Sequence, residues 1–501
     1  MFKKVYPWQK LDFSFYLKLL FIGVIFFTIP YFVSADYRGQ ITTFFVNSSY
    51  DLDKRPQIEA SLVYLIPEIY FYVDDKWWNV LGYDERNDVI LTFKDLGEEF
   101  KDKIYPILTS NFGKEWNPGI DNDPHLTVLV HPMHAEAGGY FNNSDEYSRF
   151  QATNSNEREM IYLNSKYVVS DYIESFFAHE FMHLITFNQK ERKQGIQEEI
   201  WLNEARSEFA STLVGYDTNY ERSNLQSRVR NFIDKPSDSI TEWKSQIYDY
   251  GVLNLFVQYL VDHYGVEILA DSLKFKEVGI ASLNKALAEN GFEEDFSQIF
   301  TDWTITVFVN DCDLGLKYCY LNENLKNLKV VPSTNYLPLS GESSLSLTER
   351  TKNWAGNWYK FVGGQKKLKI EFIGNPNVNF KVPYLTEDFS GNYSLGFFQF
   401  DEKQKGEILI PDFGTKVLSL VIIPSIQTKE SDFDGSEEDF AFFWQASTIN
   451  EQEPVPSQKP VSEMTKAELE IKIMEVQQKI IEFLKQLIEI TMARIANLQS
   501  Y

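Results

Sequence analysis

Cysteine is nearly absent from this chain, with two copies among 501 residues, and histidine is scarce, with six. Cys312 and Cys319 are separated by six residues, and in an exported protein such a pair predicts a local disulfide. Two free thiols are the alternative. The pair alone offers too few ligands for a metal site, because structural zinc takes four.

Positive charge is also in short supply. The chain has 48 lysines and arginines against 72 aspartates and glutamates, a net charge of −24. This balance excludes nucleic acid as a partner, because phosphates would be repelled. Internal repeats of 20 to 50 residues are absent from the sequence, which excludes solenoids and propellers.

The apolar run near the N-terminus, residues 19–32, is shorter than the roughly 20 residues that a membrane span needs. Lys3, Lys4 and Lys10 precede this run, and a small-x-small ending follows it at Ala35. This order predicts a secretory signal over residues 1–35. An uncleaved N-terminal anchor that tethers the protein to a membrane is the alternative. Both interpretations predict an exported protein, either secreted or held at the cell surface.

Two regions of different pattern follow the signal. Residues 57–325 begin with strand-like runs and continue with helical spacing, which predicts one α+β unit. In residues 330–448, apolar Leu368, Ile370 and Phe372 alternate with charged neighbours, as expected for half-buried strands. These strand signals are separated by turn residues and predict a β-sandwich module.

The C-terminal end is predicted to carry a tethered helix. Residues 449–464 include three prolines and form a linker, and residues 465–499 form an amphipathic helix with coiled-coil spacing. Its apolar stripe comprises Leu469, Ile473, Val476, Ile480, Phe483, Leu487 and Ile490. One helix on a flexible linker cannot bury such a stripe by itself, so we expect self-association or binding to a surface partner. Docking on a membrane surface is the weaker alternative, because the helix is rich in glutamate.

The sequence FFAHEFMHLITF contains an H-E-x-x-H motif, formed by His179, Glu180 and His183. Residues four apart on a helix point the same way, so the two imidazoles can bind the same Zn²⁺ ion. Glu180 is placed to reach a metal-bound water as a general base. Asp171 and Glu174 predict a capping box at the start of this helix.

A catalytic zinc needs a third protein ligand and one open position. Glu204 lies twenty-one residues after His183, on a second predicted helix, and a turn at Gly195 would let that helix return antiparallel. Glu204 is therefore the candidate third ligand. Glu208, one helical turn further, is expected to accept a hydrogen bond from a ligand histidine.

This arrangement resembles the gluzincins, the thermolysin-like zinc peptidases. Four stretches in order, GYFNNSDEY, SNEREMIYLN, HEFMHLITF and IWLNEARSEFAS, resemble more narrowly the hyicolysin-type metallopeptidases, over roughly residues 60–310. The resemblance implies a zincin-type metallopeptidase domain over residues 57–325, in which His179, His183 and Glu204 bind zinc and Glu180 is the base. Glu208 departs from the pattern, because thermolysin-like enzymes have aspartate there.

Two further roles follow from the same resemblance. The strand NEREMIYLN, residues 156–164, would be the edge strand that pairs with an extended peptide. Many gluzincins use a tyrosine to stabilise the oxyanion, and Tyr250 is our candidate, with its neighbour Tyr248 as the alternative. The expected function is a secreted or cell-surface zinc endopeptidase that acts on protein or peptide substrates.

Other interpretations of the chain are weaker. A surface binding or adhesion protein with a vestigial peptidase unit conflicts with the intact motif. An aminopeptidase would need a G-x-M-E-N stretch, which the sequence lacks. His131 and His134 suggest a second metal site, and the acidic stretches at residues 121–125 and 432–439 suggest Ca²⁺, although neither fits an EF-hand loop.

Overall fold

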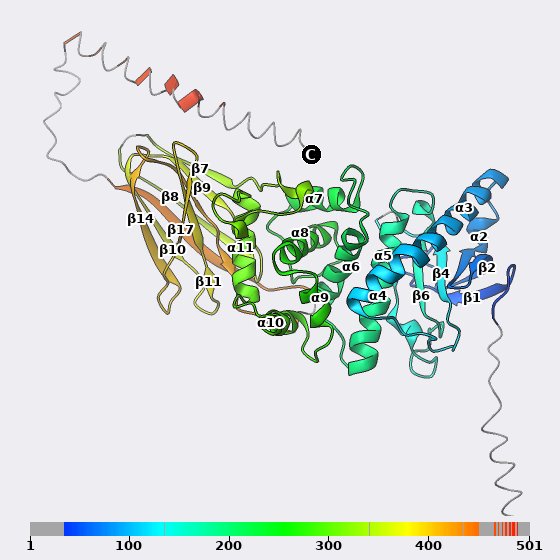
Figure 1. The fold of residues 1–501 in the computed structure, drawn as a ribbon. Coiled ribbons are helices and arrows are strands. Elements are labelled where there is room, and N and C mark those ends of the chain that lie inside the picture. Colours follow the sequence, from blue (N-terminus) through cyan, green and yellow to red (C-terminus); the bar gives the residue numbers. More distant parts are fainter. Residues whose placement is uncertain are drawn as a thin grey trace, which may run out of the picture.

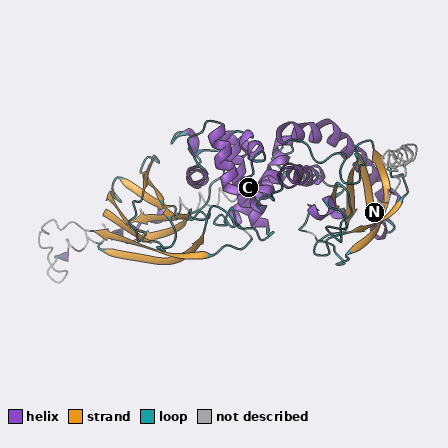
Figure 2. Cartoon of the chain, turned by 90° about the horizontal axis from the view of Figure 1, so that it is seen from below, coloured by secondary structure: helices purple, strands orange, loops and turns teal. Residues whose placement is uncertain are grey.

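The computed structural model describes residues 35–134, 136–339, 341–433 and 435–449, with scattered positions between 465 and 488. The predicted signal before residue 35, the linker and most of the predicted C-terminal helix lie outside the described residues. The described part is α+β: strands gather at its two ends and helices lie between them (Figures 1 and 2). None of the described helices is long and apolar enough to cross a membrane.

A six-stranded mixed sheet forms the N-terminal end, in the order β1-β2-β3-β4-β6-β5. Its strands are β1 (Ile41–Phe45), β2 (Gln57–Ile66), β3 (Ile69–Asp74), β4 (Leu126–His131), β5 (Gly139–Phe141) and β6 (Met160–Asn164). The strands β3, β4 and β6 run parallel, and the other pairings are antiparallel. Every residue of these three parallel strands is buried, as expected for a sheet that is covered on both faces.

One face of the sheet is covered by a continuous helical stretch, made of α3 (Tyr83–Glu99), the π-helical η1 (Phe100–Ile104) and α4 (Tyr105–Phe112). Phe93 of α3 stacks on Phe71 of β3, with ring centroids 4.6 Å apart. Phe100 packs edge-on against Phe177 and Phe181 of the next helix, α5. Aromatic contacts thus join the sheet, the stretch formed by α3 and η1, and α5 into one core.

The helix α5 (Ile173–Thr186) carries the H-E-x-x-H motif and continues as a π-helical turn, η4 (Phe187–Arg192). It begins after Tyr172 without a side-chain cap, so the predicted capping box of Asp171 and Glu174 is wrong. Most of its apolar residues are buried and anchor the helix between the sheet and the helices that follow. Those helices are α6 (Ile200–Val214), α7 (Asn224–Asp234), α8 (Ile247–Tyr264), α9 (Glu267–Ser272), α10 (Gly279–Glu289) and α11 (Phe296–Val309). The predicted disulfide between Cys312 and Cys319 is confirmed.

The second group of strands has its own core. One layer has the order β13-β12-β15-β9-β7 and the other β14-β10-β17-β8, joined where Phe413 pairs with Val417. The strands are β7 (Ser333–Leu337), β8 (Ser343–Lys352), β9 (Tyr359–Gly363), β10 (Lys366–Ile373), β12 (Pro383–Asp388), β13 (Tyr393–Phe397), β14 (Lys405–Phe413), β15 (Val417–Ile422) and β17 (Asp439–Ile449). The predicted inward residues Leu368, Ile370 and Phe372 are all buried in this core.

The β layers are attached to the helices by two tryptophans. Trp358 Nε1 donates a hydrogen bond to the carbonyl oxygen of Thr304 in α11, at 2.9 Å. The ring of Trp354 packs against Phe296 and Phe300 of the same helix. These buried contacts fix the β layers to the side of the helices that faces away from the N-terminal sheet (Figure 1).

Candidate metal and catalytic site

The two histidines of the motif lie on one face of α5. Their Nε2 atoms are 3.2 Å apart, close enough to share one metal ion. His179, Glu180 and His183 form a group whose potential ligand atoms all lie within 4.8 Å of one another. The helix is held rigidly in this orientation because its neighbouring side chains, Phe181 and Met182 among them, are buried in the core.

The second helix, α6, brings Glu204 to the same point. Glu204 Oε2 lies 3.3 Å from His179 Nε2 and 3.8 Å from His183 Nε2. Nitrogen and oxygen ligands about 2.0–2.1 Å from a tetrahedral zinc are about 3.3 Å from one another. The three atoms therefore have the spacing of zinc ligands, and the donor set of two imidazoles and one carboxylate fits this metal.

Both imidazoles are supported at their second nitrogen. His179 Nδ1 lies 3.3 Å from Glu208 Oε1, and His183 Nδ1 lies 3.2 Å from Ser207 Oγ. Such contacts fix the tautomer that leaves Nε2 free to bind a metal. Sequence reasoning anticipated the contact with Glu208 but missed Ser207, although Ser207 lies on the same helix one turn after Glu204.

Glu208 is itself held by Arg228 of α7. The guanidinium donates two hydrogen bonds of 2.7 Å, one to each carboxylate oxygen. Asn254 of α8 adds a third at 3.1 Å. Burial alone would raise the pKa of Glu208, but Arg228 and His179 hold it far below its usual range. The carboxylate is therefore ionised, and it can orient His179. No local pattern in the sequence indicates a role for Arg228.

Glu180 is buried beside the two histidines. Burial raises the pKa of its carboxyl to about 8, and nearby Glu204 and Glu208 add to this effect while His179 opposes it. Gly139 of β5 lies against it: a Cβ added there would come within 3.0 Å of Glu180 Cγ and 2.6 Å of the Tyr162 carbonyl oxygen. A glycine at this position therefore lets the strand approach the base closely.

A cleft in two adjoining parts, of about 580 and 320 Å³, surrounds these groups. Both parts are lined by Gly139, His179, Glu180 and two tyrosines, Tyr50 and Tyr250. Tyr250 is near His179, with ring centroids 6.4 Å apart, and its alternative Tyr248 lies against Lys235 instead. Tyr50, which the sequence analysis missed, comes from the loop between β1 and β2 and stacks on Tyr140 at 4.8 Å.

The edge strand beside the cleft is β5, and the prediction that residues 156–164 provide it is wrong. The strand β6 in that segment lies between β4 and β5 and is hydrogen-bonded on both sides. The three residues of β5 fold back antiparallel onto β6 and end the sheet. Gly139 and Phe141 of this strand line the cleft.

The other histidines considered in the sequence have structural contacts. His131 is fully buried, its Nδ1 lies 3.2 Å from Asp51 Oδ2, and its Nε2 faces the Tyr140 hydroxyl at 3.5 Å. His134 lines the larger part of the cleft. Because both nitrogens of His131 have partners, a second metal site formed with His134 is not supported.

The buried ion cluster at Asp51 holds the Tyr50 loop, and we expect Asp51→Asn to destabilise the fold by about 2–4 kcal/mol at pH 7. Asp51 pairs with Arg55, which also pairs with Asp74. Burial alone would raise the pKa of Asp51, but Arg55 and His131 lower it to about 2. Because the pKa of Asp51 is lower in the folded state, the ionised carboxylate stabilises the fold at pH values above the unfolded-state pKa of about 4. This stabilisation is lost as the pH falls toward 2 and the carboxylate is protonated.

Urea unfolding at several pH values measures this effect. The difference between wild type and Asp51→Asn should be largest at pH 7 and should shrink between pH 4 and pH 2. Asp53→Asn is the matched control, because its side chain is 49% exposed and pairs with Lys76 at the surface. A difference that stays constant down to pH 2 would contradict the assigned charge interaction.

One comparison with known proteins finds a metallopeptidase relative. The neutral metalloprotease ShpI of Staphylococcus hyicus is 27% identical over 191 residues, which cover 33% of this chain and 41% of the relative. The chain thus matches less than half the length of that relative. This similarity relates the chain to a metallopeptidase.

Other comparisons add little. Searches against family models give no match. The solved structure of the pre-peptidase C-terminal domain of Bacillus anthracis collagenase matches 23% of this chain and 96% of its own, at 13% identity and a TM-score of 0.15. The Yersinia pseudotuberculosis-derived mitogen matches 24% of this chain and 98% of its own, at 12% identity and a TM-score of 0.16. At these TM-scores the two matches carry no argument. The relationship to a metallopeptidase is therefore carried by the sequence match alone.

Proposed function

We propose that this chain is an exported zinc-dependent endopeptidase of the gluzincin type. The observation that carries the proposal is the meeting of His179 Nε2, His183 Nε2 and Glu204 Oε2 within 3.8 Å of one another, at the wall of an open cleft. A His₂Glu set leaves a fourth position for water, as catalytic zinc sites do. Export rests on the signal predicted in residues 1–35.

Bound at these three residues, zinc would lower the pKa of water and polarise the peptide carbonyl. Glu180 accepts the proton of the attacking water and later delivers it to the leaving amine. Burial raises the pKa of this carboxyl toward neutrality, where one group can both accept and release a proton. Glu208 and Ser207 keep the imidazoles in the ligating tautomer.

The substrate would bind as an extended strand along β5. The strand ends the sheet and two of its residues, Gly139 and Phe141, line the cleft, so its outer edge offers backbone hydrogen bonds to a peptide. The cleft is open, which suits the middle of a polypeptide better than a chain end. The substrate is therefore a protein or peptide, cleaved internally.

Metal analysis combined with digestion of casein tests the proposal. We expect one zinc per chain and hydrolysis that stops when the metal is removed and returns when zinc is restored. A chain that holds zinc but cleaves neither casein nor unstructured peptides would instead favour the surface binding protein with a vestigial peptidase unit.

Tyr250→Phe is expected to lower kcat about 100-fold with little change in KM or zinc content. The phenol is the candidate donor to the oxyanion that develops on the carbonyl, and loss of one such donor costs about 100-fold or more. Steady-state kinetics on a peptide substrate measure the change.

Tyr248→Phe is the matched control, because Tyr248 lies two residues away and contacts Lys235 rather than the cleft. It should keep wild-type kinetics. Equal losses in both variants, or a Tyr250→Phe enzyme with full kcat, would remove Tyr250 from the mechanism and turn attention to Tyr50.

A further inference from the structure

A second group of buried acids lies outside the catalytic cleft. Glu146 ends the short 3-10 helix η2 (Asn143–Glu146), and Glu159 directly precedes β6. Their residues are 2% and 5% exposed. Burial, and for Glu146 also the charge of Glu159, raises the pKa of both carboxyls, and the two groups are within hydrogen-bonding reach of each other. Two neighbouring carboxylates that are buried away from water repel each other unless a cation or a proton lies between them.

Among the described residues, no lysine, arginine or histidine forms an ion pair with Glu146 or Glu159. Both carboxylate oxygens of Glu146 and Oε2 of Glu159 are buried without a hydrogen-bond donor among the described residues. Glu159 Oε1 accepts one bond, from the backbone N–H of Ile120 at 2.7 Å. Asp121 adds further negative charge nearby, and Arg158 is turned away to Asp36. Buried polar atoms without partners are rare in native proteins, and a buried acid pair of this kind needs a proton, a water or a cation to satisfy it.

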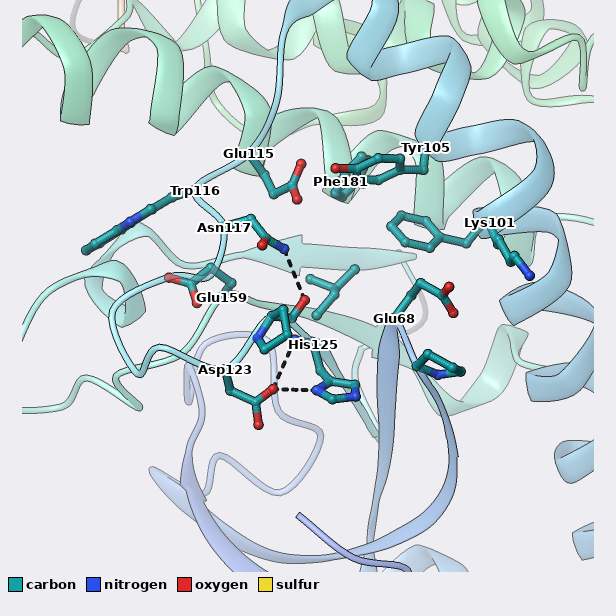
Figure 3. Close-up of a pocket in the computed structure, with 14 residues that line it drawn as sticks. Glu68, Lys101, Tyr105, Glu115, Trp116, Asn117, Asp123, His125, Glu159 and Phe181 are labelled. Atoms are coloured by element: carbon teal, nitrogen blue, oxygen red, sulfur yellow. Dashed lines mark hydrogen bonds and ion pairs between the residues drawn. The ribbon is translucent and has the colours of Figure 1, made fainter. Parts of the chain in front are cut away.

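Of the two acids, Glu159 borders a cavity. Glu159 lines a cavity of about 330 Å³, on the side formed by Trp116 and Asn117 (Figure 3). The backbone at Gly119 passes so close that a Cβ there would overlap the Glu159 carboxylate. The loop therefore wraps the carboxylate on one side and leaves an entry path on the other, as a metal site requires.

We propose that Glu146 and Glu159 bind a divalent cation of the Ca²⁺ type, with Asp121 adding to the negative potential. The donors are all hard oxygens, which calcium prefers, and its flexible coordination accepts the remaining ligands from backbone carbonyls and water. Zinc is not expected here, because the site offers neither imidazole nor thiolate.

The position of this site gives the cation a structural role. Glu146 follows the edge strand β5 by five residues, and Glu159 directly precedes β6, the strand to which β5 is paired. A cation between them ties the end of β5 to the start of β6 and to the loop at Ile120. The edge strand is thereby held at its place beside the catalytic cleft, whether or not the catalytic site is loaded.

Calcium titration of the calcium-depleted, zinc-loaded full chain tests the proposal. We expect saturable Ca²⁺ binding by calorimetry and a rise in Tm of about 3 °C or more at saturation. Glu146→Gln and Glu159→Gln should each weaken Ca²⁺ binding at least tenfold and lose the Tm rise. Glu98→Gln is the control, because its side chain is 65% exposed on α3, and it should bind Ca²⁺ as wild type does.

Failure of the glutamine variants to fold is not expected, because glutamine keeps the shape of the acid and removes the repulsion between the two carboxylates. Without calcium, both variants should therefore be at least as stable as the wild type. No saturable Ca²⁺ binding by the wild type, or unchanged binding by both variants, would overturn the proposal; the second result would place calcium elsewhere, for example at residues 432–439. The Glu180→Gln variant should bind Ca²⁺ normally, so this test is separate from that of the peptidase activity.

Discussion

Glu180→Gln is expected to lower kcat/KM on a peptide substrate about 1,000-fold and to leave zinc content at one per chain. The amide has the size of the acid but cannot take a proton from water, and general acid–base catalysis contributes about 10²–10⁴-fold. Glu180 is 5% exposed and lies beside the ligands without being needed to hold the metal, because His179, His183 and Glu204 form the ligand set. Kinetics and metal analysis on the same preparation measure both quantities.

The control for this variant is Glu174→Gln, which makes the same change on the same helix. Glu174 lies in the first turn of α5 and is not among the residues that line the cleft. It should retain wild-type activity and zinc. If Glu180→Gln hydrolyses peptides at the wild-type rate, another group is the base. If it loses zinc, Glu180 is a ligand and the assignment of Glu204 must be reconsidered.

Local spacing allowed the sequence to predict much of this site. The interval of four between His179 and His183 sets their common face on a helix, and the interval to Glu204 leaves room for one turn and an antiparallel return. The alternation of Leu368, Ile370 and Phe372 likewise predicts one buried face of a strand. The disulfide was predictable because its two cysteines are close in sequence and have no competitors.

Contacts made by the tertiary fold were not predictable. Tyr50 comes from a loop between two early strands, and Arg228 from a helix beyond the motif, and neither sits in a pattern that indicates a site. The family resemblance placed the edge strand in residues 156–164, which contain β6, and β5 has only three residues, too few to show a period. Only the pairing order decides which strand lies at the edge.

The loss of Glu204 tests the metal site itself, and Glu204→Ala is expected to reduce bound zinc to below a tenth per chain at micromolar zinc. Two imidazoles remain, and two protein ligands are too few for a catalytic zinc site. We expect kcat/KM to fall about 10⁴-fold or more, since both the activated water and the polarised carbonyl depend on the metal. Metal analysis after dialysis, with kinetics at rising zinc, measures both.

Unfolding does not explain such a loss, because the variant removes one of three carboxylates from a crowded site. Glu180, Glu204 and Glu208 all lie near His179, and the charges of Glu204 and Glu208 raise the pKa of Glu180. Glu204→Ala should therefore keep the wild-type Tm measured without zinc, while losing the stabilisation that zinc adds. Glu221→Ala, at an exposed glutamate in the loop after α6, should change neither zinc content nor kinetics. A Glu204→Ala chain that still binds one zinc tightly would show that the third ligand is another residue. This result would contradict the peptidase mechanism that assigns Glu204 to the metal.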